Sequence, residues 1–209
     1  PGAADLLTYR AWRALARADV VVHDRLVPLD VLDDLGPDVE VVDVGKAPGH
    51  HKVPQDGINA LLVDRALAGR HVVRLKGGDP YLFGRGGEEV HACLEAGVDV
   101  EVVPGVTSAL SVPARAGIPV TQRGVSTSVH ITTGHAGADR ASVAAMAAGA
   151  TVVILMGVTA LPGIVDAALA GGCDEDTPVA IVENGTTVHE RVTRGTLADI
   201  VRISGETGV

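Results

Sequence analysis

The sequence predicts an α/β fold in which strands and helices alternate nearly throughout the chain. Short runs of branched apolar residues alternate with stretches whose apolar residues follow a helical spacing. Glycine-rich turns follow most of the strand candidates. With 209 residues and 46% apolar content, the chain is long enough to bury a real core. This pattern favours largely parallel sheets, whose ligands bind beyond the carboxyl ends of the strands.

Eight segments of the first half follow this alternation. Strands are predicted over residues 18–24, 39–45, 71–78 and 98–103. Helices are predicted over residues 6–16, 56–68, 88–96 and 107–116. In the second of these helices Ile58, Leu61 and Leu62 share a helical face, and Gly69 ends it.

The second half repeats the pattern after the segment from Pro113 to Pro119, which is the natural place to divide two lobes, residues 1–114 and 115–209. Strands are predicted over residues 128–133, 151–156, 178–182 and 190–195. Helices are predicted over residues 140–148, 161–170 and 197–203. Both ends look incomplete, and we expect a strand before Pro1 and another after the last residue in a longer parent protein.

Residues 72–89, VVRLKGGDPYLFGRGGEE, carry the clearest sign of a binding site. The strand ends in two glycines, Gly77 and Gly78, which let another molecule approach the backbone closely. Asp79 offers acceptors to the hydroxyl or amine groups of a ligand. The chain has one Trp, two Tyr and one Phe, and Tyr81 and Phe83 both fall here. A domain packed almost wholly with aliphatic residues has therefore placed half of its aromatics beside one loop.

Charge and composition narrow the function classes. A net charge of −9 argues against general nucleic-acid binding, which needs basic surface. No apolar run approaches a membrane span, no signal peptide is visible, and the two cysteines read as reduced thiols of a cytoplasmic protein. All three lysines nevertheless lie in one region together with basic neighbours, and such a region suits a small polyanion, with chance clustering as the alternative. This cluster comprises Lys46, His50, His51, Lys52, Arg74, Lys76 and Arg85.

Two charged residues follow strand candidates and have two readings each. Asp24 is either a capping residue or a positioned acid or base. Lys46 is either a solvated surface residue or a group that donates a proton and offsets charge. Metal binding is disfavoured for His50 and His51, because adjacent histidines in a Gly/Pro turn more often line a polar loop. It is disfavoured for His130 and His135, because they have no Cys or carboxylate partner at a convincing spacing. P-loop, dinucleotide, GxSxG and HExxH motifs are absent from the sequence.

Four segments together closely resemble the tetrapyrrole methylase family, in order along essentially the whole chain. They are VGKAPGHHKVPQ, RLKGGDPYLFGRGGEE, VVPGVTSAL and VENGTT. The resemblance is nearest to the members that act on uroporphyrinogen III, and it is the first segment that points to them. It implies two α/β lobes with a cleft between them, bound S-adenosylmethionine, and a homodimer in the cytoplasm.

The resemblance also assigns residues. It implies that Asp24 accepts a proton and that Lys46 donates one, in place of a capping role for Asp24 and a solvated surface position for Lys46. The cofactor contacts that it implies are Pro1, Gly77, Gly78, Asp79, Leu82, Thr107, Ser108, Met156 and Gly185. Arg25, Arg74 and Arg85 are candidates for binding substrate carboxylates. No metal is implied.

The reaction implied is C-methylation of uroporphyrinogen III at two ring carbons to give precorrin-2, with S-adenosylhomocysteine as co-product. A methylase of a later corrin precursor and a non-catalytic domain that binds a nucleoside-like ligand are the alternatives. The sequence departs from the family at Gly2-Ala3-Ala4, where Gly-Asp-Pro is common, and at Leu82, where Ile or Val is more usual.

Overall fold

The computed structural model describes residues 2–45 and 53–209, which form two compact units. The first unit ends at Ser108 and the second begins at Ala109, so the division falls a few residues before the predicted one at 114/115. Each unit contains both strands and helices, and the α/β prediction is confirmed. No helix among the described residues is long and apolar enough to cross a membrane.

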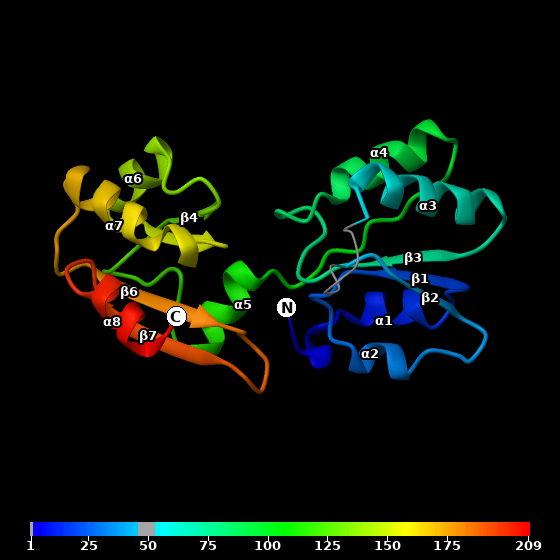
Figure 1. The fold of residues 1–209 in the computed structure, drawn as a ribbon, viewed down its shortest axis with the longest axis horizontal. Helices are drawn as coiled ribbons and strands as arrows, with labels where there is room; N and C mark the ends of the chain where they lie inside the picture. Colours follow the sequence, from blue (N-terminus) through cyan, green and yellow to red (C-terminus); the bar gives the residue numbers. More distant parts are fainter. Residues whose placement is uncertain (1, 46–52) are drawn as a thin grey trace. The chain divides into compact units, whose positions relative to one another are not determined.

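A three-stranded parallel sheet forms the centre of the first unit (Figure 1). Its strands are β1 (Val20–His23), β2 (Glu40–Asp43) and β3 (Val72–Leu75), in the order β2-β1-β3. Val20, Val21 and Val22 are fully buried, as expected for a central strand that is covered on both faces. The pairing places His23 beside both Asp43 and Leu75, so all three strands end at the same edge.

Helices cover both faces of this sheet (Figure 1). α1 (Tyr9–Leu15) and α2 (Asp30–Asp33) lie on one side, and α3 (Gln55–Leu67) and α4 (Gly86–Glu95) lie on the other. The alternating strand residues divide accordingly, because Val21 joins the core under α1 and α2 while Val20 and Val22 pack with α3 and α4. The sheet is therefore packed between two separate apolar layers, one on each face.

Two predictions for this unit are corrected. The N-terminal helix is interrupted: a 3-10 turn covers Ala4–Leu6, and Thr8 then caps α1 by accepting a hydrogen bond from the Ala11 amide. Residues 98–103 do not form a strand. Their alternating valines fit one, but within the described chain no backbone hydrogen bond joins residues 99–104 to β3, so no ladder forms.

The second unit opens with most of α5 (Ser108–Arg115) and holds two separate pairs of strands. β4 (Val129–Thr133) and β5 (Thr151–Leu155) are parallel, whereas β6 (Pro178–Glu183) and β7 (Arg191–Thr196) form an antiparallel pair. The remaining elements are α6 (Arg140–Ala147), a 3-10 turn at Val158–Ala160, α7 (Leu161–Ala170) and α8 (Ile200–Thr207). Ile200 and Ala168, both fully buried, join α8 and α7 to Ile181 of β6. α8 begins later than predicted, since Asp199 accepts from the Thr196 amide and closes a turn first.

Candidate active site

Asp24 stands at the carboxyl end of the central strand, directly after β1. Its backbone amide continues the sheet by donating to the Leu75 carbonyl at 3.4 Å. Its carboxylate is one-third exposed, and the two oxygens differ. Oδ1 accepts from Arg74 Nη2 at 2.6 Å, whereas Lys76 Nζ is 3.7 Å from Oδ2, too far for a hydrogen bond. The strand end therefore presents a carboxylate that is fixed through one oxygen.

Arg74 is held almost entirely by the protein. Nη1 donates to the carbonyls of Val22 and Leu75, at 3.3 and 3.1 Å, and Nε donates to Glu89 at 3.2 Å. Together with the bond to Asp24, four of its five N–H groups have partners. This geometry favours a role for Arg74 in holding Asp24 over the predicted role in gripping a substrate carboxylate.

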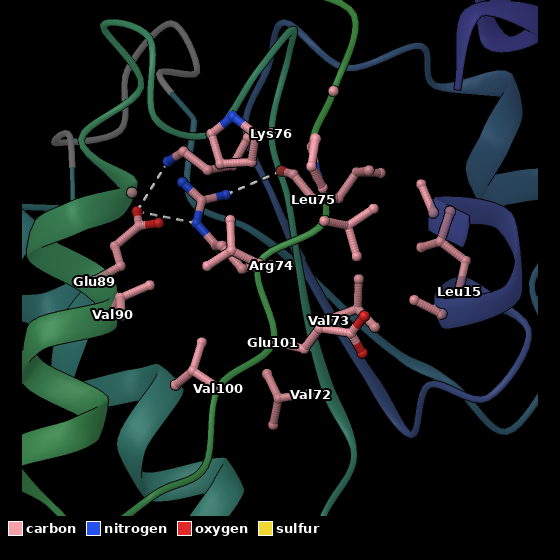
Figure 2. Close-up of a pocket in the computed structure, with 18 of the residues that line it drawn as sticks. Leu15, Val72, Val73, Arg74, Leu75, Lys76, Glu89, Val90, Val100 and Glu101 are labelled. Carbon is pink, nitrogen blue, oxygen red and sulfur yellow. Dashed lines mark hydrogen bonds and ion pairs between the residues drawn. The ribbon is translucent and has the colours of Figure 1, made fainter. Parts of the chain in front are cut away.

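Glu89 and Lys76 complete a buried cluster, of which the sequence singled out Lys76 for its charge but not Glu89. Lys76 Nζ donates to Glu89 Oε1 at 3.0 Å, and both side chains are about 5% exposed. Figure 2 shows Arg74 and Lys76 reaching from the sheet towards Glu89 on α4. The helical spacing held a usable signal, because Gly86, Glu89 and Cys93 share the buried face of α4. A glutamate on such a face needs cationic partners.

The GGDP loop, residues 77–80, follows β3 at the same sheet edge. Asp79 fastens this loop internally: Oδ1 accepts from the Tyr81 amide at 2.9 Å, and Oδ2 accepts from the Gly105 amide at 3.0 Å. An added Cβ at Gly105 would lie 2.1 Å from the Gly78 carbonyl oxygen, so only glycine fits there. Asp79 thus has a structural task besides its predicted cofactor contact.

The loop lies between two other segments predicted to belong to the site. A Cβ at Gly77 would come within 3.0 Å of the Leu26 carbonyl oxygen, two residues after Asp24. A Cβ at Gly78 would lie 3.8 Å from the backbones of Thr107 and Ser108. The structure therefore brings together the GGDP loop, the segment after β1 and the start of α5.

The turn after the GGDP loop places two aromatic side chains at the surface. Tyr81 and Phe83 are 58% and 44% exposed, and Leu82 between them is half-buried. Arg85 follows, and both of its donating nitrogens bind Glu88 at 2.6–2.8 Å. This bidentate pair raises the pKa of Arg85 and lowers that of Glu88. Because water reaches both groups, the pair contributes little to stability.

Arg25 is exposed and forms no ion pair with a carboxylate of the described chain. A Cβ at Gly45, which follows β2, would lie 2.7 Å from the Arg25 amide nitrogen, so the ends of β1 and β2 touch. Lys46, the predicted proton donor, comes next in sequence but lies outside the described residues, as does Pro1. Most of the VGKAPGHHKVPQ segment is likewise outside them.

Two predicted cofactor residues lie in the second unit. Met156 follows β5 with a positive φ of 58° and is half-exposed, and it lines a hollow with Gly134 and His135. Gly185 has a packing reason of its own, because a Cβ there would lie 2.5 Å from a methyl group of Val112 on α5. The structure thus leaves Met156 accessible to a ligand and packs Gly185 against a helix.

A cavity of about 410 Å³ runs along the outer edge of β3 (Figure 2). β3, residues 98–106 and the Leu15 side of α1 line it, and Arg74, Lys76 and Glu89 close one end. Most of its wall is apolar, so it does not suit a ligand rich in carboxylates. The polar surface at the carboxyl ends of β1, β2 and β3 is the better candidate for binding such a ligand.

One further polar cluster has the composition of a catalytic triad but not its arrangement. The fully buried Ser142 hydroxyl donates to Asp139 at 2.6 Å and lies 3.2 Å from His130 Nε2. Asp139 also caps α6 by accepting from the Ser142 amide. A serine nucleophile needs the histidine as its base, with the carboxylate beyond it, so this cluster is a helix cap. Within residues 2–45 and 53–209 no group of three metal-ligating side chains is found.

The described residues define an α/β domain with glycine-rich loops and an ion-paired acid at the carboxyl ends of parallel strands. The sequence profile of the family described as Tetrapyrrole (Corrin/Porphyrin) Methylases matches residues 1–201. The chain belongs to this family.

Relatives in the family are similar over nearly the whole chain. It is 45% identical over 99% of its length to the S-adenosyl-L-methionine-dependent uroporphyrinogen III methyltransferase of Methanosarcina barkeri, covering 83% of that protein. It is 47% identical over 99% of its length to siroheme synthase of Pseudomonas fluorescens, but covers only 45% of it. The chain thus spans about half the length of the siroheme synthases that it matches.

Solved structures of methyltransferases share the fold of this chain. The uroporphyrin III C-methyl transferase of Thermus thermophilus superimposes with a TM-score of 0.80 and 41% identity, covering 97% of this chain and 87% of that one. A cobalt precorrin-4 methyltransferase gives a TM-score of 0.85 at 27% identity, covering 98% of this chain and 85% of that one.

Proposed function

We propose that this chain is a methyltransferase domain that uses S-adenosylmethionine to methylate uroporphyrinogen III at two ring carbons, giving precorrin-2. The observation that carries the proposal is Asp24, a carboxylate fixed through Oδ1 at the carboxyl end of β1, beside the GGDP loop. The similarity to the uroporphyrinogen III methyltransferase of Methanosarcina barkeri supports the choice of substrate.

The residues present fit a nucleoside-type cofactor. The GGDP loop keeps bare glycine backbone close to Thr107 and Ser108, and Met156 lines an open hollow. We assign cofactor contacts to Gly77, Gly78, Asp79, Leu82, Thr107, Ser108, Met156 and Gly185, and to Pro1 outside the described residues. When bound, S-adenosylmethionine supplies a methyl group that its sulfonium already activates. The protein's task is to align this methyl group and to exclude water.

Asp24 takes the proton that the reaction releases. With S-adenosylmethionine bound, transfer of its methyl group to a pyrrole carbon would add one positive charge to the ring system and leave S-adenosylhomocysteine as the neutral thioether. Loss of one proton restores neutrality, and Oδ2 of Asp24 is the free acceptor. Lys46 is assigned as proton donor, and Arg25 and Arg85 as partners for substrate carboxylates.

A methylase of a later corrin precursor is the second candidate. The TM-score of 0.85 to the cobalt precorrin-4 methyltransferase favours it, since the same cofactor contacts serve another acceptor. We further propose that the protein is a homodimer and works in the cytoplasm. Sedimentation equilibrium tests the oligomeric state.

Anaerobic incubation with uroporphyrinogen III and S-adenosylmethionine labelled in its methyl group separates the candidates. The proposal expects labelled product from uroporphyrinogen III. Label only in corrin precursors supports the second candidate. Tight cofactor binding without transfer to any acceptor leaves a ligand-binding module.

A further inference from the structure

We propose that Glu89 is a positioning residue that holds Lys76 away from Asp24 and so keeps Oδ2 of Asp24 free to accept a proton. This inference rests on the proposed role of Asp24. Glu89 lies in the first turn of α4, at the edge of the cavity beside β3, and its side chain is 5% exposed. It does not reach the surface where a substrate binds.

A single oxygen of Glu89 gathers three donors. Oε1 accepts from Arg74 Nε at 3.2 Å, from Lys76 Nζ at 3.0 Å and from Gln55 Nε2 at 3.2 Å. The start of α4 also favours a carboxylate through the helix dipole. Glu89 therefore holds both Arg74 and Lys76 by hydrogen bonds to one carboxylate oxygen.

The two cations are divided unequally between the two acids. Arg74 bridges them, with Nη2 on Asp24 at 2.6 Å and Nε on Glu89. Lys76 sits with Glu89 and remains 3.7 Å from Oδ2 of Asp24. The side chain of Lys76 is 6% exposed, so no water-filled alternative competes for its ammonium group. A buried ammonium group that loses one anion moves to the next.

Removal of the negative charge of Glu89 has a defined consequence. Oδ2 of Asp24 is the nearest remaining anion, so Lys76 Nζ closes the gap and forms a charge-assisted hydrogen bond with it. The oxygen that accepts the proton is then blocked. The four charged groups are neutral as a set, whereas Glu89→Gln leaves one surplus cation.

The test compares three variants of the full-length protein. Glu89→Gln keeps the size and an acceptor oxygen, and kcat should fall about 10–100-fold, up to the lower end of the roughly 100–10,000-fold that a general base contributes, with little change in the Kd for S-adenosylmethionine. Glu89→Gln/Lys76→Met removes the blocking cation, and kcat should recover most of the loss. Glu95→Gln on the same helix, exposed and paired with His91, is the matched control and should equal the wild type.

A crystal structure of Glu89→Gln tests the geometry without any assay of activity. The Nζ–Oδ2 distance should shorten from 3.7 Å to about 2.8 Å, the length of a charge-assisted hydrogen bond. If Glu89→Gln does not fold, Glu89→Met replaces it, because it also removes the negative charge that holds Lys76. Lys76 that stays in place, an unchanged kcat, or a double variant no faster than the single one overturns the proposal. A wild type without activity on uroporphyrinogen III defeats the proposed function instead, and the crystal structure still decides the role of Glu89.

Discussion

Gly105→Ala should destabilise the first unit and loosen the GGDP loop. The new Cβ would lie 2.1 Å from the Gly78 carbonyl oxygen and 3.2 Å from Asp79 Cα, whereas ordinary contacts begin at 3.4 Å. Both obstacles are backbone atoms, so the GGDP loop and the backbone at Gly105 must separate by more than 1 Å. That separation also stretches the hydrogen bond from the Gly105 amide to Asp79 Oδ2, now 3.0 Å.

The expected magnitude combines two effects. Overpacking costs about 1–3 kcal/mol, and a strained hydrogen bond to a carboxylate adds about 1 kcal/mol. We therefore expect a loss of about 2–4 kcal/mol in the free energy of unfolding, measured by urea denaturation, and weaker binding of S-adenosylmethionine by calorimetry. Gly87→Ala on α4 is the matched control, since a Cβ there meets nothing within 4 Å and the helix gains propensity. A Gly105→Ala variant as stable as Gly87→Ala would refute the close packing of these two loops.

Three other predictions follow from the described contacts. Asp24→Asn should lower kcat about 100-fold or more and leave the Kd for S-adenosylmethionine within about twofold, measured by steady-state kinetics and calorimetry; equal turnover would remove its role as proton acceptor. Burial, and next the charge of Glu89, raise the pKa of the Cys93 thiol, so a thiol reagent at neutral pH should label the less buried Cys173 first, with mass spectrometry as the readout. Asp139→Ala should lower the Tm of the protein at neutral pH, because hydrogen bonds from Ser142 hold the pKa of Asp139 below its ordinary value. A carboxylate whose pKa is lower in the folded than in the unfolded protein stabilises the fold at pH values above the unfolded pKa. This stabilisation is lost as the pH falls through the folded pKa, so the Tm difference between the variant and the wild type should shrink towards pH 3. A Tm difference that stays constant with pH would contradict the prediction.

The sequence predicted every strand that the described residues form, whether central or at the edge of a sheet. The run Val20–Val22 reads as a buried parallel strand, and it forms the centre of the sheet. Residues 98–103 have similar valines, yet they form no ladder with β3. The pattern of one segment reports its preference for extended backbone, whereas a strand also needs a free edge within hydrogen-bonding distance. The single break in the predicted N-terminal helix likewise came from a local cap at Thr8.

The sequence predicted which segments come together better than it predicted the contacts of their side chains. Asp24 and the GGDP loop do share one sheet edge, as strand ends of a parallel sheet must. The direction of the Arg74 side chain is not visible in the sequence, and it points to Asp24 and Glu89 within the fold. Lys76 was noted only as one of several basic residues and Glu89 was not singled out, because their pairing comes from burial next to each other, which only the structure reveals.

The number and position of the methyl groups transferred test the central claim most directly. With S-adenosylmethionine carrying ¹³C in its methyl group, NMR of the product from uroporphyrinogen III should show two labelled methyl groups, both bonded to ring carbons. Two molecules of S-adenosylhomocysteine should form for each substrate consumed. Labelled methyl groups on oxygen or nitrogen, or none at all with bound cofactor, would contradict the account.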